Sequence, residues 1–227
     1  LHLPHPEEGL RRAITQLASV HLAPTQRARR NLEREGIAPG SIAVVGNTSI
    51  DAIQARTERG AHSTNEFMEL DGPYCVLTVH RRETWGDPMS RIALAIWTLA
   101  DEFPEVTFVC PLHPNPIVRS SFAELDALPN LKIVDPLRHD EFARLLANSL
   151  LVLSDSGGIQ EEATVLKVPV VILREETERP EVVEVGVGVL AGTSATRILE
   201  TTRPLLHSRL DNQWSALATS PFGDGRA

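Results

Sequence analysis

Short runs of apolar residues alternate with longer segments of helical period along most of the chain. Each apolar run has the length of a strand that is buried on both faces of a sheet. The expected strands are 42–45, 75–79, 106–110, 131–134, 150–153, 170–173 and 187–190. The expected helices are 8–19, 25–35, 48–58, 87–101, 116–127, 139–147, 158–167, 179–185 and 195–207. This alternation predicts an α/β fold of repeated strand–helix units around a parallel sheet.

One stretch of the chain breaks this alternation. Residues 57–72 are rich in charge and glycine and lack a strong period, so we interpret them as a linker. The expected domains are a short leading piece, 1–58, and a complete α/β domain, 59–227. The chain begins at Leu1 rather than at a methionine and stops just after a Gly-Asp-Gly turn, and we expect both ends to be cuts in a longer sequence.

The composition is that of an ordinary globular protein, with 227 residues, 42% of them hydrophobic, and a formal charge of -8. Positive and negative residues are interspersed, which argues against nucleic acid or an anionic membrane as a partner. No apolar run reaches the ~20 residues that span a bilayer, and a cytoplasmic location is expected. Cys75 and Cys110 fall in apolar runs without metal-ligand spacing, so we expect reduced core thiols and no metal site.

Ligands of open parallel sheets bind beyond the carboxyl ends of the strands, so the residues after each run are candidates for chemistry. After 150–153 comes Ser-Asp-Ser-Gly-Gly-Ile-Gln-Glu-Glu. Glycines at a helix start let a phosphate approach free N–H groups and the positive end of the helix dipole. An ordinary capped helix would begin in the same way. The carboxylates one turn later favour a nucleotide, because Glu162 could bind the ribose hydroxyls.

Polar side chains also follow three other predicted strands. His80, Arg81 and Arg82 come after 75–79, where the two cations could neutralise a diphosphate. His113 stands in a proline-stiffened loop after 106–110, and Arg179 precedes a proline-started helix after 170–173. Taken singly, these are also consistent with a charged loop, a stiff turn and surface ion pairs. Four polar clusters at four strand ends predict one shared crevice.

The leading segment carries Glu7 and Glu8 at the start of an expected helix, just after Pro6. Acidic residues at this place ordinarily complement the helix dipole, worth about 0.3–1 kcal/mol. A general acid/base role for Glu7 is the alternative, and it rests on a family resemblance.

These clusters together resemble the second half of the UDP-N-acetylglucosamine 2-epimerase family, of the non-hydrolysing bacterial type. The resemblance covers essentially the whole chain, and the matching segments follow the family's order. Its most specific parts are 154–162 and Thr-Glu-Arg-Pro-Glu at 177–181. The other matching segments are 6–8, 46–48, 50–52, Thr78 with 80–83, His113 with 115–116, 135–136 and 221–225.

The resemblance implies a fold and a set of site residues. The fold would be a Rossmann-like parallel sheet with helices on both faces, the second half of a two-domain glycosyltransferase-B-like architecture. Ser156, Gly157 and Gly158 would bind the diphosphate, Glu162 the ribose and Phe142 the uracil. His80 would contact the leaving UDP, and Glu7 would be an acid/base carboxylate. The expected substrate contacts also include Arg11, Arg81, His113 and Arg179.

The implied reaction interconverts UDP-GlcNAc and UDP-ManNAc by elimination and re-addition of UDP. It would need no cofactor or metal. The resemblance also implies that the full-length protein is a homodimer. Further carboxylates would come from a first domain ahead of Leu1, so the chain alone is expected to be inactive. Departures from the family's pattern are Leu10, Leu137 and Lys167-Val168-Pro169. The alternatives are a non-catalytic UDP-sugar-binding fragment and a glycosyltransferase of similar architecture, although such transferases lack the combination of 80–83 with 177–181.

Overall fold

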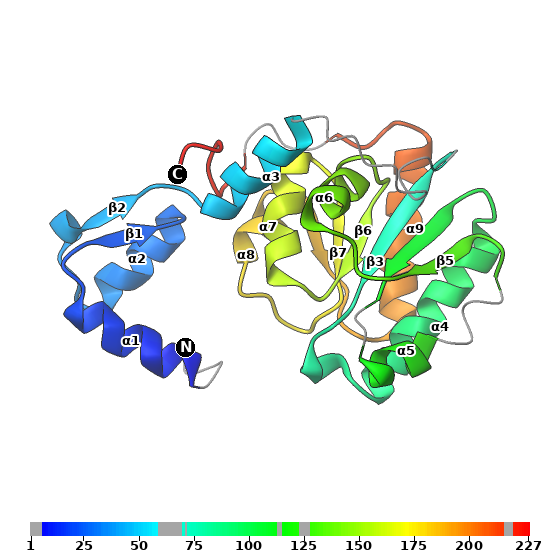
Figure 1. Ribbon diagram of the computed structural model, residues 1–227, viewed down its shortest axis with the longest axis horizontal. Coiled ribbons are helices and arrows are strands. Elements are labelled where there is room, and N and C mark those ends of the chain that lie inside the picture. Colours follow the sequence, from blue (N-terminus) through cyan, green and yellow to red (C-terminus); the bar gives the residue numbers. More distant parts are fainter. Residues whose placement is uncertain (1–5, 59–69, 71, 113–114, 123–127, 216–219) are drawn as a thin grey trace. The chain divides into compact units, whose positions relative to one another are not determined.

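The computed structural model divides into two compact units (Figure 1). Unit 1 comprises Leu1–Asp51 with Phe222–Ala227, and unit 2 comprises Ala52–Pro221. The structure describes residues 6–58, 70, 72–112, 115–122, 128–215 and 220–227. Most of the expected linker, 57–72, therefore lies outside the described residues, and so does His113.

Unit 2 is built around a parallel sheet, which has six strands among the described residues. Its order is β5-β4-β3-β6-β7-β8, with every neighbouring pair parallel. Counted along unit 2 alone, this is the 3-2-1-4-5-6 order of the Rossmann fold. The prediction of a Rossmann-like parallel sheet is confirmed. The strands are β3 (Tyr74–Thr78), β4 (Thr107–Pro111), β5 (Leu131–Val134), β6 (Val152–Ser154), β7 (Val170–Ile172) and β8 (Gly188–Leu190).

Helices cover both faces of this sheet (Figure 1). One layer contains α4 and α9 packed together, with α5 beside α4, and the other contains α7 between α6 and α8. The last part of the expected helix 116–127 lies outside the described residues. The elements are η3 (Arg82–Thr84), α4 (Asp87–Glu102), α5 (Pro116–Phe122), α6 (His139–Ala147), α7 (Gly157–Leu166), α8 (Pro180–Glu184) and α9 (Ala195–Leu210). No helix of the described segments is both long and apolar enough to cross a membrane.

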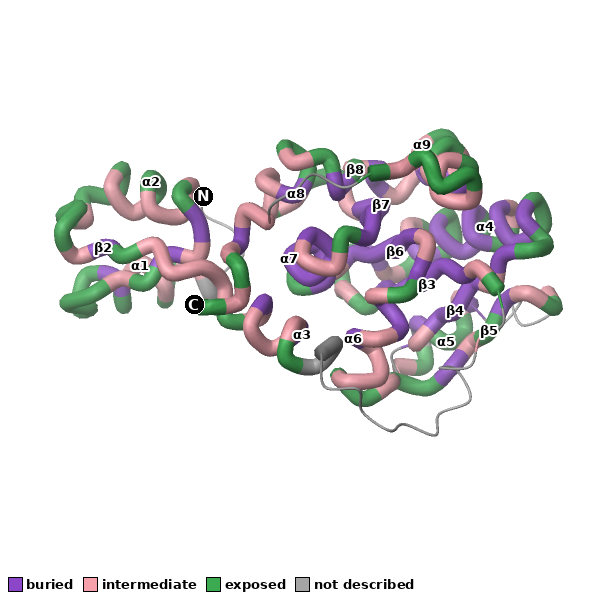
Figure 2. The backbone as a smooth tube through the Cα atoms, turned by 90° about the horizontal axis from the view of Figure 1, so that it is seen from above, coloured by how far each residue is buried: buried purple, intermediate pink, exposed green. Residues whose placement is uncertain are grey.

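The core follows from the alternation of side chains along the central strands. Cys75 and Leu77 of β3 point into the core formed with α4, α5 and α9, whereas Val76 points to the opposite face. The buried stretches run through β3, β6, β7 and α7 (Figure 2). Cys75 and Cys110 are free thiols in this core, as expected, and burial raises the pKa of both.

The prediction that every strand is buried on both faces was wrong for three of the expected runs. Lys132 of β5 and Val189 of β8 are exposed because these two strands form the edges of the sheet. Ala43 is exposed because the run 42–45 forms a strand of a separate sheet in unit 1. Only a strand with a neighbour on each side and a helix layer on each face is fully covered.

Among its described residues, unit 1 contains a two-stranded parallel sheet and the helices α1 and α2, with strand β1 between these helices along the chain. The strand β1 was not predicted, because it is three residues long and Leu22 at its centre is exposed. The next helix along the chain begins in unit 1 and continues into unit 2. The elements are α1 (Glu7–Leu17), β1 (His21–Ala23), α2 (Gln26–Arg34), η1 (Pro39–Ser41), β2 (Ile42–Val44) and α3 (Thr48–Glu58).

The end of the chain packs onto the loop after β2, within unit 1. The Asn47 amide donates to the Phe222 carbonyl over 2.8 Å, and the Ala227 amide donates to Asp51 Oδ1 over 3.1 Å. Gly46 and Gly223 both have positive φ, and a Cβ on Gly223 would stand 3.1 Å from the Gly46 Cα. These two backbones approach so closely that glycine is required at both positions.

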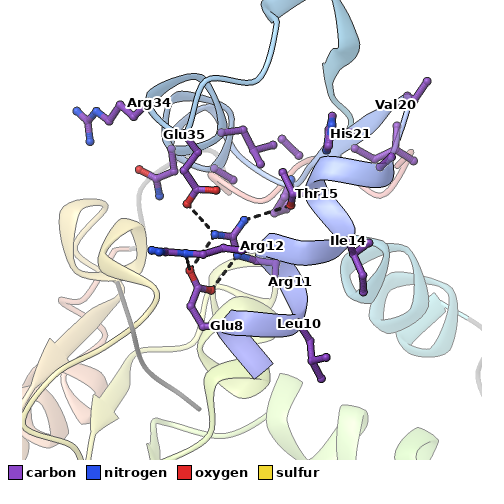
Figure 3. A pocket seen from close by; sticks show the side chains of 17 residues that line it. Glu8, Leu10, Arg11, Arg12, Ile14, Thr15, Val20, His21, Arg34 and Glu35 are labelled. Atoms are coloured by element: carbon purple, nitrogen blue, oxygen red, sulfur yellow. Dashed lines mark hydrogen bonds and ion pairs between the residues drawn. The ribbon is translucent and has the colours of Figure 1, made fainter. Parts of the chain in front are cut away.

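A cluster of charges holds α1 to the end of α2 in unit 1 (Figure 3). Arg11 donates from Nε and Nη2 to the Glu8 carboxylate, each over 2.8 Å, and from Nη2 to Glu35 Oε1 over 2.7 Å. Arg12 adds a bond of 3.2 Å to Glu8. The hydrogen bonds from Arg11, opposed by desolvation and reinforced by Arg12, lower the pKa of Glu8 from 4.5 to about 2.

We expect the contribution of this cluster to the stability of unit 1 to decrease at acid pH. Because the pKa of Glu8 is lower in the folded state than in the unfolded chain, its ionised form stabilises the fold above pH 4.5 and the effect is lost as pH falls towards 2. Carbonyl ¹³C NMR of the side chain should find a midpoint near 2 in the native protein.

In an Arg11→Met variant the pKa of Glu8 should rise towards its ordinary value. The control is Arg34→Gln, which removes an exposed arginine from the same unit and should leave the midpoint of Glu8 unchanged. A Glu8 midpoint near 4.5 in the native chain would contradict the prediction.

Candidate functional site

Three neighbouring strands of unit 2 end at the same level. Thr78 of β3 pairs with Ser154 of β6, and Ser154 pairs with Ile172 of β7. The loops that leave these strands therefore begin side by side at one edge of the sheet. They carry the residues after 78, 154 and 172, which include three of the four polar clusters expected from the sequence. The strand order reverses between β3 and β6, which is where doubly wound folds bind their ligands.

The start of α7 is open to an anion. Ser156 is the N-cap residue, yet no side chain caps the helix, and no acidic residue lies in its first turn. A Cβ placed on Gly158 would meet nothing within 4 Å, and one on Gly157 would stand 3.6 Å from Arg81 Nη2. An approaching anion thus meets bare backbone, the positive end of the helix dipole and a guanidinium.

The loop after β3 is anchored by Asp155, the first residue after β6. Its buried carboxylate accepts from the Arg81 amide over 2.9 Å and from the His80 amide over 3.1 Å, both to Oδ2. His80 Nδ1 lies 3.4 Å from Oδ1. The Thr84 hydroxyl lies 3.0 Å from Oδ2 and 2.6 Å from the Arg81 carbonyl oxygen, and it donates to one of the two. Asp155 therefore connects the loop after β3 to the loop that leads into α7.

Three arginines and two glutamates form an ion network across the loops after β3 and β7, in which Arg179 Nη1 lies 3.8 Å from Glu178. Arg174 Nη2 lies 3.0 Å from Glu83 and 3.4 Å from Glu178, whereas Arg81 Nη1 is 3.7 and 3.9 Å from the same two carboxylates. Arg174 is thus held more closely than Arg81. The looser pairing leaves Arg81 better able to exchange these carboxylates for a phosphate.

The loop after β7 is tied to α7 by side chains. Thr177 donates from its hydroxyl to Gln160 Oε1 over 2.6 Å, and the Arg179 amide donates back to the Thr177 oxygen over 3.0 Å. Arg179 Nε donates to Glu161, whose side chain is only 8% exposed. These contacts fix the place of Arg179 at the start of α8 relative to the start of α7.

Glu162 follows on the same helix, and its carboxylate lies 3.7 Å from His139 Nε2 at the start of α6. Phe142, partly exposed, stands three residues after His139, so both occupy one side of α6. The ribose and uracil residues expected from the sequence therefore belong to two helices that pack together.

The structure brings together only part of the predicted set. His80, Arg81, Ser156 and Gly157 meet through Asp155 and through the Arg81 guanidinium. Arg179 lies against Glu161, next to Glu162 in sequence. Glu7 and Arg11 belong to unit 1. The side chain of Glu7 and all of His113 lie outside what the structure describes.

Sequence reasoning gave no role to Asp155, Gln160, Glu161 or Thr177. Their function is visible only in their partners: Asp155, Glu161 and Thr177 each contact a residue that the pattern singled out, and Gln160 accepts a hydrogen bond from Thr177. One signal was available for Asp155: an acid directly after a run of buried strand residues must find donors in the next loop. Among the residues that the structure describes, no group of three or more His, Cys, Asp or Glu is arranged to hold a metal ion.

Comparisons with known proteins identify the family and the fold. The family model described as UDP-N-acetylglucosamine 2-epimerase matches residues 1–227. A putative UDP-N-acetylglucosamine 2-epimerase of Thermotoga maritima is 42% identical over 99% of this chain. The UDP-GlcNAc 2-epimerase of Neisseria meningitidis, solved bound to UDP-GlcNAc, has a TM-score of 0.89 and 37% identity over 98% of the chain. The S. aureus MnaA–UDP structure has a TM-score of 0.87 and 36% identity, also over 98%.

The chain covers only part of each of these proteins: 60% of the Thermotoga protein, 62% of the Neisseria chain and 61% of the S. aureus chain. The residues matched by the family model, 1–227, include both units. The chain belongs to the UDP-N-acetylglucosamine 2-epimerase family.

Proposed function

We propose that the full protein interconverts UDP-GlcNAc and UDP-ManNAc, and that this chain supplies the half of the active site that binds UDP. The observation that carries the proposal is the open, glycine-lined start of α7 with Arg81 beside it, at the switch point of the sheet. Further support comes from the Neisseria and S. aureus relatives, whose structures contain UDP-GlcNAc and UDP.

Each part of the nucleotide has a proposed partner in unit 2. The diphosphate lies at Ser156, Gly157 and Gly158, where backbone N–H groups and the helix dipole favour negative charge. Arg81 and Arg179 add positive charge from the neighbouring loops. The second carboxylate of α7, Glu162, accepts hydrogen bonds from the ribose hydroxyls. The proposed uracil contact is Phe142, and His113 remains a proposed substrate contact.

The reaction that fits this site is an elimination. The C2 proton of an N-acetylhexosamine is not acidic, so its direct removal would be slow. If UDP leaves C1 as the proton leaves C2, the product is 2-acetamidoglucal, and re-addition with protonation on the other face inverts C2. Negative charge grows on the departing diphosphate, so groups that bind it more tightly in the transition state accelerate the reaction. His80 and the start of α7 take this role.

The acid/base chemistry at C2 is proposed for unit 1 and for the part of the relatives that this chain does not span. Glu7 is the candidate carboxylate within the chain, and Arg11 a candidate substrate contact. Glu8, by contrast, is fully engaged by Arg11 and Arg12 and serves to hold α1. We therefore propose that the 227-residue chain binds UDP but does not turn over.

We also propose that residues 1–58 are the end of a first domain and residues 59–227 the UDP-binding domain. The compact units have other bounds, because unit 1 ends at Asp51 and includes Phe222–Ala227. The exposed apolar residues of unit 1 support the assignment of the leading segment to a first domain. Leu10, Ile14 and Leu17 form one stripe along α1 and are exposed, Leu17 to 85%. Val20 and Leu22 extend the exposed surface, and residues from α1, β1 and α2 line a hollow of about 1060 Å³ (Figure 3).

A two-stranded sheet with an open apolar side is only marginally stable by itself. The proposed cover is the remaining portion of the first domain. A homodimer of the full protein and a cytoplasmic location are further parts of the proposal.

The chain should bind UDP in preference to GDP, because the proposed uracil contact, Phe142, and the proposed ribose contact, Glu162, both lie in unit 2. Replacing Arg179 or Glu162 by Ala should weaken UDP binding by roughly 1.5–3 kcal/mol, the cost of losing a hydrogen bond to a charged group. Calorimetric titration of the chain and its variants with both nucleotides measures this.

The matched controls for these two changes are Arg203→Ala and Glu102→Ala, which break an exposed ion pair between α9 and α4 in the same unit. Both controls should bind UDP like the parent. Equal affinity for UDP and GDP would count against the proposed uracil and ribose pocket around Phe142 and Glu162. Losses below about 0.5 kcal/mol for both site variants would leave Arg179 and Glu162 without a role in UDP binding.

The full-length protein should interconvert the two UDP-sugars without added nicotinamide cofactor or metal. In deuterium oxide the product should carry deuterium at C2, since the abstracted proton can exchange before the opposite face is protonated. A Glu7→Gln variant keeps the shape of the side chain but cannot act as a base, so turnover should collapse while UDP affinity is kept. NMR of the product and calorimetry are the two measurements.

Two results of that experiment would count against the mechanism. An active Glu7→Gln enzyme would remove the role given to that carboxylate. Epimerisation without solvent deuterium would exclude exchange at C2.

A charge placed in the apolar stripe on α1 should affect stability differently in the 227-residue chain and in the longer protein that includes the rest of the first domain. Leu17→Lys should change the stability of the 227-residue chain by less than about 0.5 kcal/mol, because the side chain is exposed there. In the longer protein the same change should cost 2 kcal/mol or more, roughly the cost of an unpaired polar group in a core. Denaturant unfolding measures both.

The control on the same helix is Gln16→Lys, which should be neutral in both lengths of the protein. Equal and small effects of Leu17→Lys in both would mean that nothing covers the stripe.

A further inference from the structure

Asp155 is a buried carboxylate that needs explanation. Its side chain is entirely covered by the protein, although an ionised carboxylate loses much hydration energy on burial. Such a group persists in a fold only when hydrogen bonds replace its water. All the partners described for it come from one short segment, the loop and 3-10 turn after β3.

The two carboxylate oxygens have different partners. Oδ2 accepts from two successive backbone amides, those of His80 and Arg81, and lies 3.0 Å from the Thr84 hydroxyl. Oδ1 is 3.4 Å from His80 Nδ1 and 3.3 Å from the His80 amide nitrogen. The backbone hydrogen bonds fix the course of the loop, and the Nδ1 contact places one edge of the imidazole ring beside the carboxylate.

This geometry selects one form of the imidazole. A neutral histidine carries one proton, on Nδ1 or on Nε2, and the partner of one nitrogen decides the state of the other. A carboxylate beside Nδ1 favours the proton there, which leaves Nε2 as the nitrogen with a free lone pair. The imidazole of His80 is 45% exposed, so the ring is accessible while its Nδ1 edge faces a buried acid.

We infer that Asp155 is a positioning residue, which holds His80 in the Nδ1-protonated form and places Arg81 over the start of α7. Arg81 reaches Gly157 because its amide is held by the same carboxylate that precedes α7. One side chain thus sets the distance between the imidazole, the guanidinium and the site proposed for the diphosphate. The effect on ligand binding rests on the proposed function, whereas the effect on the imidazole can be tested without any ligand.

The direct test is long-range ¹H–¹⁵N NMR of the unaltered chain, at a pH well above about 6.5, where imidazoles are neutral. His80 should display a protonated Nδ1 and an unprotonated Nε2. The reference within the same spectrum is His207, an exposed imidazole that packs against the ring of Phe103, with centroids 5.1 Å apart. A His80 spectrum with the proton mainly on Nε2 would overturn the inference, whatever the chain binds.

Variants can show whether Asp155 positions His80 and Arg81 or only stabilises the fold. Asp155→Asn should abolish the preference for the Nδ1 proton and weaken UDP binding about tenfold or more, the loss expected for hydrogen bonds to a charged group. Thr84→Val removes a hydroxyl near Oδ2 but keeps the carboxylate, so the Nδ1-protonated form should remain. The control for charge alone is Asp101→Asn, an exposed acid near the end of α4, which should change neither measurement.

The outcomes distinguish this inference from the proposed function. Loss of the Nδ1-protonated form in Asp155→Asn with UDP affinity unchanged would keep the imidazole contact and overturn the coupling to the phosphate site. Absence of UDP binding in the parent chain, with the His80 form as expected, would count against the proposed function and leave the role of Asp155 towards His80 standing. Should Asp155→Asn fail to fold, the spectrum of the parent and that of Thr84→Val still decide the imidazole part.

Discussion

The site depends on three parallel strands that end at the same level. Because β3, β6 and β7 pair in register at Thr78, Ser154 and Ile172, the loop after β6 starts one strand spacing from each of the other two loops. A shift of β6 by one residue against its neighbours would turn Asp155 towards the opposite face of the sheet. The buried carboxylate could not then reach the amides of His80 and Arg81. The hydrophobic pattern that fills both helix layers is therefore also what aligns the polar loops.

Much of unit 2 could be predicted from the sequence, because its central strands are covered on both faces and leave continuous apolar runs. The prediction was wrong where covering is incomplete, as at Val189 and Ala43, since an edge strand needs apolar residues on fewer sides. The strand β1 was missed for a related reason. It has three residues, and no local signal separates such a strand from a turn.

The site was predictable for residues whose type suggests chemistry and unpredictable for those that act through others. Glycines at a helix start and arginines after a strand have few other reasons to occur together, so Gly157 and Arg81 stood out. Glu161 did not, because an acid on a helix is common and its role depends on Arg179, which follows 18 residues later. Such pairings depend on the fold of two loops, which a single sequence does not specify.

The way Arg179 is held has a consequence for which side chain can occupy that place. Glu161 engages Nε, and the Glu178 carbonyl accepts from Nη1 over 3.3 Å. Within the described residues Nη2 has no hydrogen bond. A guanidinium is a rigid planar fork, so one edge can stay tied to the protein while another donor points elsewhere. Lysine carries the same charge on a single nitrogen and cannot divide it in this way. Position 179 therefore requires the planar guanidinium as well as its positive charge. Replacing Arg179 by Lys would keep the charge but lose this arrangement of donors.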